Sequence, residues 1–409
     1  MPTRGSAAIV TVGSELTQGL RVDTNTAEIA RELSRRGFDV AENLSIGDDA
    51  ELLAVSLARL VAVHALVVTT GGLGPTHDDV TREAAAKALG IALSTDDDIV
   101  ERLRDVAARH NDPAAREAVM TQALVLDGAQ IVHATTGTAP GQVVPTPAGS
   151  LVLLPGPPSE MRPMLRSALT AFDATMADPA ELGVTGMSES DVQHAAQRAL
   201  ATFDGIVLTV LAKPGDVRVL LIDDGAGEQA IGEAARAVAA EIGDACYSTD
   251  GFSLAEELLR ECAAHGLTVA TAESCTGGLV SAAITDVPGS SAAFVGGVVS
   301  YANQMKLDAL GVPAGLLAQY GAVSEQTAIA MAEGVRDLSG ADLAVSITGI
   351  AGPEGGTAEK PVGLVWFALA SASGTVATQR LYARGGRDSI RARATSNGLD
   401  LLRRAARSR

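Results

Sequence analysis

The sequence predicts an α/β protein in which two α/β domains with largely parallel sheets are joined by a small α+β module. Two observations lead to this prediction. Short apolar runs rich in β-branched residues alternate with segments of helical spacing in both the first and the last part of the chain. In addition, 409 residues are too many for one ordinary hydrophobic core, so more than one domain is expected.

The N-terminal domain is expected to cover residues 1–170. Residues 7–13 and 65–70 are apolar runs typical of buried strands, and residues 25–37 have helical spacing that ends at a glycine. The segment 150–161 repeats the order of strand, Gly/Pro turn and helix start. In a parallel sheet the loops after the strands gather at the carboxyl edge, where α/β proteins bind their ligands.

A small α+β module is expected over residues 177–248, after a stretch of looser composition. It contains a helical segment, two β-rich runs and a second helical segment, which are residues 190–201, 205–212, 216–223 and 227–243. A third domain is expected over residues 252–409, because β-rich runs again alternate with helical segments up to a terminal helix.

Charge and composition argue against several classes of protein. A net charge of −18 disfavours broad contact with nucleic acid or an anionic membrane, although a helix N-terminus or an arginine can still hold a small anion. The three cysteines contain no CxxC pair and give no metal signature, which favours a reducing compartment. The apolar run near the N-terminus is too short for a signal peptide, and no run approaches a membrane span. We therefore expect a soluble cytoplasmic protein.

The segment TVATAESCTGGLVSA places Ser274 and Cys275 side by side after an apolar run. None of the six histidines lies after His265, which argues against a hydroxyl or thiol activated by histidine. Cys275 is the alternative nucleophile, because thiols are intrinsically reactive and a helix N-terminus lowers their pKa. A small buried residue at a strand-to-helix turn explains Cys275 more simply.

Lysine is the other side chain that activates a serine by accepting its proton. Only four of the 31 basic residues are lysines, and arginine cannot lose its proton near neutral pH. Lys306 follows a strand-like run, whereas Lys360 lies in a Gly-rich loop. We expect Ser274 and Lys306 to act as nucleophile and base, which requires a site that lowers the lysine pKa. The alternative is that both lysines are ordinary surface residues.

Two turns in this domain favour an anion or a developing oxyanion. Residues 276–278 leave backbone N–H groups free at a predicted helix start, and the turn that begins at Thr348 is a second candidate. Arg387 lies beside another helix start, where it would pair with an anionic ligand.

The segment GGLGPTHDD, residues 71–79, is Gly-rich and acidic and directly follows a predicted strand. Its glycines would let the backbone approach a phosphate, and Asp78 or Asp79 would hold a divalent metal that bridges phosphate oxygens. A tight turn capped by an aspartate explains the same motif without a ligand. The pocket residues predicted here, apart from the two aspartates, are Glu15, Asn25, Gly71, Gly72, Gly74, Thr76 and Glu160.

The motifs TAESCTGG, SYANQMK, GAVSEQTA, SITGIAGPEGG, EKPVGLVWFA and GGRDSIR together resemble the nicotinamide mononucleotide deamidase domain of the CinA (competence/damage-inducible) family. Upstream, TTGGLGPTHDDVTREA, GTAPG and LLPGPPSEM are similar to the molybdopterin-binding-like N-terminal domain of the same family. The module between them resembles the KH-type middle domain of that family. The resemblance covers nearly the whole chain.

The resemblance implies hydrolysis of the carboxamide of nicotinamide mononucleotide to nicotinate mononucleotide and ammonia, with no cofactor. It implies that Ser274 is the nucleophile, Lys306 its base and Tyr301 a supporting residue. It also implies a homodimer. It places Thr348 and Arg387 around the substrate. The other residues that we expect to bind the substrate are Glu273, Thr276, Gly277 and Gly278.

For the N-terminal domain, the resemblance implies either a vestigial pterin-type pocket or cleavage of ADP-ribose that depends on a divalent metal such as Mg²⁺. The middle module carries only Lys213 and Arg218 near its hairpin in an acidic chain, so we expect a scaffold and no RNA binding. Three functions therefore stay open: an amidohydrolase, an N-terminal pyrophosphatase as the main activity, and a non-catalytic accessory protein of competence or the DNA-damage response.

Overall fold

The computed structural model describes residues 5–172 and 178–409, so the expected start of the middle module at residue 177 lies outside the described residues. The chain forms two compact units, Met1–Asp178 and Pro179–Arg409. The second unit contains both the segment expected as the middle module and the segment expected as the C-terminal domain. No helix in these two described ranges combines the length and the apolar character needed to cross a bilayer.

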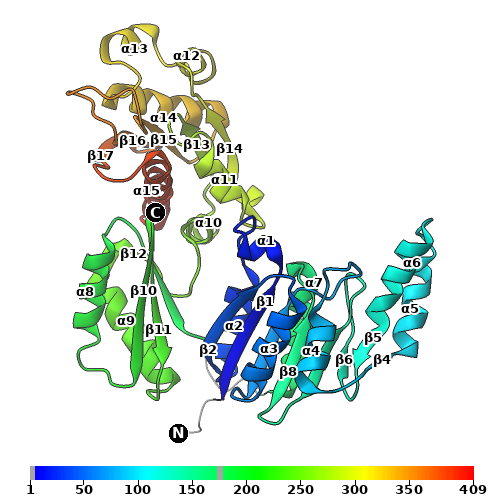
Figure 1. Ribbon diagram of the computed structural model, residues 1–409. Helices are drawn as coiled ribbons and strands as arrows, with labels where there is room; N and C mark the ends of the chain where they lie inside the picture. The colour runs from blue at the N-terminus through cyan, green and yellow to red at the C-terminus, as the bar shows by residue number, and fades with distance from the viewer. Residues whose placement is uncertain (1–4, 173–177) are drawn as a thin grey trace. The chain divides into compact units, whose positions relative to one another are not determined.

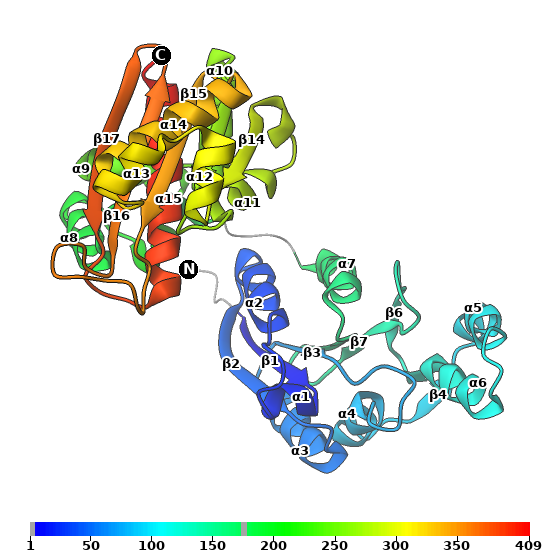
Figure 2. The same cartoon turned by 90° about the horizontal axis from the view of Figure 1, so that it is seen from above.

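The first unit is a three-layer α/β domain, as the alternating pattern predicts (Figures 1 and 2). Its six-stranded sheet has the order β2-β1-β3-β8-β7-β6, in which the first four strands are mutually parallel, β7 is antiparallel to β8, and β6 is antiparallel to β7. The strands of this unit are β1 (Ser6–Val12), β2 (Asp39–Ile46), β3 (Leu66–Thr70), β4 (Leu93–Thr95), β5 (Leu124–Leu126), β6 (Gln130–Val132), β7 (Gly141–Pro145) and β8 (Ser150–Leu154). The helices are α1 (Ser14–Thr17), α2 (Asn25–Arg35), α3 (Ala50–Val61), α4 (Thr81–Leu89), α5 (Asp97–Ala107), α6 (Pro113–Met120) and α7 (Pro158–Ala168).

Successive residues of β1 pack on opposite faces of the sheet, because side chains alternate along a strand. Ala7 and Ile9 face the core beneath α2 and α7, whereas Ala8 and Val10 face the core beneath α3 and α4. Both faces are buried, which explains why β1, β3 and β8 are continuous apolar runs in the sequence.

The middle module, residues 179–248, is an antiparallel sheet of order β10-β11-β9-β12 covered by two helices. Its elements are β9 (Ala180–Val184), α8 (Glu189–Ala199), β10 (Ile206–Lys213), β11 (Asp216–Asp223), α9 (Glu228–Ile242) and β12 (Cys246–Ser248). The two helices and the central hairpin lie where the sequence predicts them. The sequence analysis did not predict the short strands β9 and β12. They have no clear apolar periodicity of their own and are recognised only from their pairing within the sheet.

The C-terminal domain is also a three-layer α/β structure, with the sheet order β14-β13-β15-β16-β17 (Figures 1 and 2). Helices α10, α11 and α15 cover one face of the sheet, and α14 with the end of α12 covers the other. The strands are β13 (Val269–Glu273), β14 (Phe294–Val299), β15 (Leu343–Gly349), β16 (Leu364–Ser371) and β17 (Gly374–Leu381). The helices are α10 (Leu254–His265), α11 (Leu279–Thr285), α12 (Asn303–Leu310), α13 (Ala314–Tyr320), α14 (Glu325–Ser339) and α15 (Arg387–Arg407).

This C-terminal sheet is more mixed than the sequence analysis expected. Strands β14, β13 and β15 are parallel, but β16 and β17 are antiparallel to their neighbours. A parallel pair needs a crossover segment, usually a helix, and no helix connects β15 to β16 or β16 to β17. The loop from Gly349 to β16 instead stays at the carboxyl edge of the sheet, where it borders the site described below.

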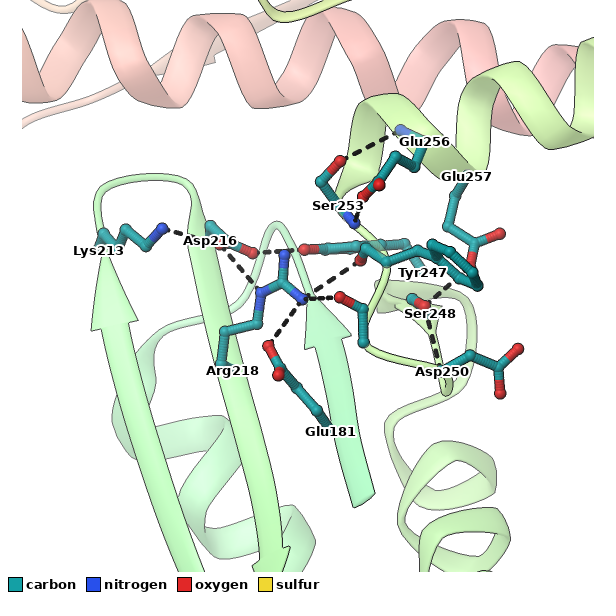
Figure 3. A network of polar contacts seen from close by, with 12 residues as sticks. Glu181, Lys213, Asp216, Arg218, Tyr247, Ser248, Asp250, Ser253, Glu256 and Glu257 are labelled. Atoms are coloured by element: carbon teal, nitrogen blue, oxygen red, sulfur yellow. Dashed lines mark hydrogen bonds and ion pairs between the residues drawn. The ribbon is translucent and has the colours of Figure 1, made fainter. Parts of the chain in front are cut away.

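Arg218 joins the middle module to the start of the C-terminal domain (Figure 3). Its guanidinium donates hydrogen bonds to the carboxylates of Glu181 and Asp216 and to the carbonyl oxygens of Gly251 and Phe252. It also lies 5.5 Å from the centre of the Tyr247 ring, whose hydroxyl donates to Asp216. One half-buried arginine therefore fixes the linker that precedes α10.

Candidate active site

A cavity of about 270 Å³ opens at the carboxyl edge of the C-terminal sheet. Ser274 lies in it because it directly follows β13, and Thr348 lies in it because it is the last residue but one of the adjacent strand β15. Tyr301 reaches it from the segment after β14. Lys306 and Arg387, from helices α12 and α15, complete the group. The structure thus brings together five of the residues that the sequence analysis assigned to this site.

The Lys306 amine lies 3.2 Å from the Ser274 hydroxyl oxygen. It also lies 2.7 Å from the carbonyl oxygen of Ser300 and 3.4 Å from that of Tyr301. The lysine is only 1% exposed, and no carboxylate forms an ion pair with it in the described ranges. Burial therefore lowers the pKa of Lys306 below its ordinary value, because a charged amine is costly to hold away from water.

Cys275 does not share the environment of a reactive thiol. Its side chain is buried, and this burial raises the pKa of the thiol to about 12. The nearby backbone N–H groups and Arg391 act in the opposite direction but do not compensate. A thiol with this pKa holds almost no thiolate at neutral pH, which favours Ser274 as the nucleophile.

Arg391 holds the loop that carries Ser274, a contact that the sequence analysis missed. Its guanidinium donates to the carbonyl oxygens of Cys275 at 3.1 Å and Thr276 at 2.8 Å. Arg391 lies one helical turn after Arg387 on α15, so the same helix positions both the loop and the arginine of the cavity. The one feature of the sequence that could have indicated this contact is the spacing of four residues between Arg387 and Arg391, which places both arginines on the same face of a helix.

Glu273 does not face the cavity, which corrects its assignment to the substrate. Its carboxylate is fully buried and accepts hydrogen bonds from the backbone N–H groups of Gly278, Val280 and Ser281 and from the Ser281 hydroxyl. The physical reason is that a helix N-terminus leaves N–H groups without partners and favours a negative charge. The protein's own carboxylate therefore occupies the place predicted for an anionic ligand.

The residues Thr276, Gly277 and Gly278 are likewise absent from the lining of the cavity. The N–H of Gly278 is taken by Glu273, and that of Gly277 donates to the carbonyl oxygen of Ser274. In this loop the N–H groups of Cys275 and Thr276, the two residues after Ser274, donate to no carbonyl or carboxylate within the described part of the chain, and both lie near the Cys275 thiol.

Arg387 and Tyr301 form the polar rim of the cavity. The Arg387 guanidinium donates to the carbonyl oxygen of Gly352 at 2.8 Å and to the Tyr301 hydroxyl at 3.1 Å. Tyr301 is 62% exposed, so its hydroxyl faces the mouth of the cavity and not its buried end. Thr348 is buried and donates its hydroxyl to the carbonyl oxygen of Ala322, which leaves it as part of the wall.

A second cavity, of about 430 Å³, lies in the first unit at the carboxyl edge of its sheet. All nine residues predicted for the N-terminal pocket line it: Glu15, Asn25, Gly71, Gly72, Gly74, Thr76, Asp78, Asp79 and Glu160. Partial burial raises the pKa of the Glu160 carboxyl. These residues meet because loops after parallel strands gather at one edge of a sheet.

The glycines of this pocket are explained by packing within the protein. A Cβ atom at Gly71 would lie 2.2 Å from the carbonyl oxygen of Val12, and one at Gly72 would lie 2.2 Å from the Thr81 hydroxyl. Both glycines have positive φ angles, which other residues adopt only with strain. They close the β3–α4 loop against β1, whether or not a phosphate binds there.

Asp79 stabilises the same β3–α4 loop through hydrogen bonds to its backbone. Its carboxylate accepts hydrogen bonds from the N–H groups of Gly74 and Thr76 and from the Thr76 hydroxyl, which also contacts Asp78. In the described ranges, no group of three or more His, Cys, Asp or Glu side chains is arranged to hold a metal ion. The donor set of Asp78 and Asp79 alone therefore does not fit a divalent-metal site built by the protein.

Two buried amide oxygens in this pocket have no partner in the described structure. The amide nitrogen of Asn25 donates to Thr70 and to the carbonyl oxygen of Gly156, which fixes the orientation of the amide and leaves its oxygen without a donor. The side-chain oxygen of Gln122 is also unpartnered, and Gln122 comes from the segment after α6, far from any motif in the sequence. A buried acceptor without a partner costs about 1–3 kcal/mol, so both residues favour a ligand that donates hydrogen bonds.

Comparisons with known protein families cover both parts of the chain. Residues 252–406 match the family "CinA C-terminal domain", and residues 8–174 match the family "probable molybdopterin binding domain". A competence-damage inducible protein of Desulforudis audaxviator is 39% identical over 97% of this chain and 98% of its own length. The chain belongs to the CinA family.

Other CinA relatives align over a similar length. A CinA-like protein of Akkermansia muciniphila is 38% identical over 94% of this chain and 93% of its own length. A crystal structure of the competence/damage-inducible protein from Agrobacterium tumefaciens is 46% identical and covers 36% of this chain and 91% of its own, with a TM-score of 0.36. Both cavities lie inside the segments that match the two CinA-related families.

We expect Glu273→Gln to lower the free energy of unfolding of the C-terminal domain by about 1–3 kcal/mol, because an amide cannot replace a carboxylate that accepts four hydrogen bonds. Urea unfolding of the full chain, followed by the fluorescence of the single tryptophan, Trp366 in β16, measures this directly. The exposed Glu359→Gln is the control and should change stability by less than about 0.5 kcal/mol. Equal stability of the two variants would contradict the capping role of Glu273.

Proposed function

We propose that the C-terminal domain hydrolyses the carboxamide of nicotinamide mononucleotide, giving nicotinate mononucleotide and ammonia. The observation that carries this proposal is the contact between Lys306, which is buried without a carboxylate, and the Ser274 hydroxyl at 3.2 Å. The substrate comes from the CinA resemblance, and the reaction class comes from this pair of side chains.

The surroundings of Lys306 support a neutral amine that acts as a base. A neutral amine has two N–H bonds and one lone pair. The carbonyl oxygens of Ser300 and Tyr301 accept the two N–H bonds, which leaves the lone pair for the proton of Ser274. Burial, the cause of the lowered pKa, makes this neutral form accessible.

The reaction then follows in two steps. Lys306 accepts the Ser274 proton as the hydroxyl oxygen attacks the carboxamide carbon, and it returns this proton to the nitrogen as the C–N bond breaks and ammonia leaves. Water next attacks the resulting ester while Lys306 accepts a proton from it, and Lys306 returns this proton to the Ser274 oxygen as the acyl C–O bond breaks and the carboxylate product leaves. The N–H group of Cys275, which lines the cavity beside Ser274, is assigned to the developing oxyanion. Arg387 is assigned to the substrate phosphate, with Tyr301 holding the guanidinium in place.

The nucleophile assignment is tested by measuring ammonia released from nicotinamide mononucleotide. Ser274→Ala should lower the rate at least about 10³-fold, because the acyl intermediate can no longer form. Cys275→Ala should keep most of the activity, because the thiol is buried and protonated. An inactive Cys275→Ala together with an active Ser274→Ala would reverse the assignment.

The base assignment is tested by Lys306→Arg, which keeps the positive charge but cannot accept a proton near neutral pH. We expect a loss of about 10²–10⁴-fold, close to that of Lys306→Ala. Because the lysine is active when neutral, the wild-type rate should rise with pH through the lowered pKa of Lys306 and level off above it. Near-normal turnover by Lys306→Arg would restrict Lys306 to an electrostatic role.

A second function is supported for the N-terminal cavity, which we propose binds a ribose-containing nucleotide such as ADP-ribose. The unpartnered acceptors of Asn25 and Gln122 favour a ligand with hydroxyl or amino donors. The CinA resemblance adds metal-dependent cleavage of ADP-ribose to AMP and ribose 5-phosphate. Any metal would need ligand oxygens in addition to Asp78 and Asp79, because these two do not form a complete site.

Gln122→Met separates ligand binding from stability. It removes an amide oxygen that has no partner in the protein, so stability should be unchanged or higher, while calorimetry should show ADP-ribose binding weakened about 10-fold. Gln142→Met is the matched control, because its amide bonds the backbone of Leu124 and Leu126 away from the cavity. That variant should lose stability instead. Unchanged affinity of Gln122→Met, with and without Mg²⁺, would remove Gln122 from the binding site.

A further inference from the structure

The C-terminal cavity is lined by three charged side chains: Lys306, Glu354 and Arg387. Lys306 is buried against Ser274, and Arg387 is bonded to Gly352 and Tyr301. Glu354 is different, because its exposed carboxylate has no hydrogen-bond or ion-pair partner in residues 5–172 and 178–409. It is the single carboxylate among the residues that line this cavity, and the reaction proposed above gives it no role.

The loop that carries Glu354 is held in place on both sides. A Cβ atom at Gly352 would lie 2.6 Å from a methyl carbon of Val362, and one at Gly356 would lie 2.8 Å from the Val362 backbone nitrogen. The carbonyl oxygen of Gly352 also accepts from Arg387. Glu354 thus lies between two glycines that pack against one residue, so its backbone has a defined position beside the cavity.

The pyridinium ring of the proposed substrate carries a positive charge, which is complementary to the carboxylate of Glu354. The carbonyl carbon must lie at Ser274, in the buried part of the cavity, while the ring nitrogen carries the ribose and points toward the mouth. Arg387 and Glu354 both line the cavity and are exposed, so in this orientation the phosphate and the positively charged ring nitrogen would each meet a group of opposite sign. Near a partly exposed surface, such a charge pair strengthens binding by about 5- to 10-fold.

We propose that Glu354 is a specificity-determining residue that selects the oxidised, cationic pyridinium ring over the neutral dihydropyridine ring of the reduced nucleotide. This inference rests on the proposed deamidase function. The carboxylate acts on binding of the ring and takes no part in proton transfer, which belongs to Lys306 and Ser274. The alternative is that Glu354 accepts hydrogen bonds from the ribose hydroxyls, which both forms of the nucleotide carry.

The test compares the affinities of oxidised and reduced nicotinamide mononucleotide, measured by calorimetry on the full chain. A Ser274→Ala background prevents turnover during the measurement. In this background we expect the oxidised form to bind about 5- to 10-fold more tightly than the reduced form. Adding Glu354→Gln should bring the ratio close to one by weakening only the oxidised form. Glu359→Gln, in the same loop but outside the cavity lining, should leave the ratio unchanged.

Each other outcome overturns the inference in a recognisable way. If Glu354→Gln weakens both forms equally, the carboxylate binds the ribose or supports the loop. If neither affinity changes, Glu354 has no part in recognition. If the wild type releases no ammonia and binds neither nucleotide, the proposed function itself fails and the inference fails with it. An active wild type with an unchanged ratio removes only the role of Glu354.

Discussion

The burial of the Lys306 amine beside Ser274, without a carboxylate, is the constraint on which the rest of the C-terminal site depends. A fully buried ammonium group would need a counter-charge, and the described structure supplies only two carbonyl oxygens and a hydroxyl. The parallel strands β13 and β14 make this arrangement possible, because Ser274 directly follows β13, and Ser300 and Tyr301, whose carbonyl oxygens accept from Lys306, follow β14. A lysine in this position is costly for stability, and the same burial lowers its pKa, which makes the neutral amine required by the proposed mechanism more accessible.

The same short segment contains both the proposed nucleophile and a purely structural residue. Glu273 turns inward to cap α11, whereas Ser274, the next residue, faces the cavity. Successive residues of a strand point to opposite sides, so the last residue of β13 and the first residue after it diverge. The buried carboxylate also keeps the start of α11 rigid, which limits the freedom of the Ser274 loop. An acidic residue beside a nucleophile is therefore not evidence of a catalytic role by itself.

Helix α15 connects the active site to the middle module within the second unit. Its first two turns carry Arg387 at the cavity and Arg391 on the Ser274 loop. Its last turns carry Arg403 and Arg404, which both donate to the carbonyl oxygen of Asp244 in the middle module. Together with the contacts of Arg218 at the linker, these bonds explain why the middle module and the C-terminal domain form one compact unit. The scaffold role that the charge of the module suggested is consistent with these contacts.

The sequence by itself determined the α/β alternation, the positions of most helices and strands, and the pairing of Ser274 with Lys306. These features depend on local apolar periodicity or on the scarcity of a residue type, both of which are visible in one chain. Tertiary structure decided the inward direction of Glu273, the antiparallel pairing of β16 and β17, and the presence of Gln122, Glu354 and Arg391 at the two sites. The reason is physical: a cavity is lined by side chains from segments distant in the chain, and their meeting depends on how the sheets and helices pack.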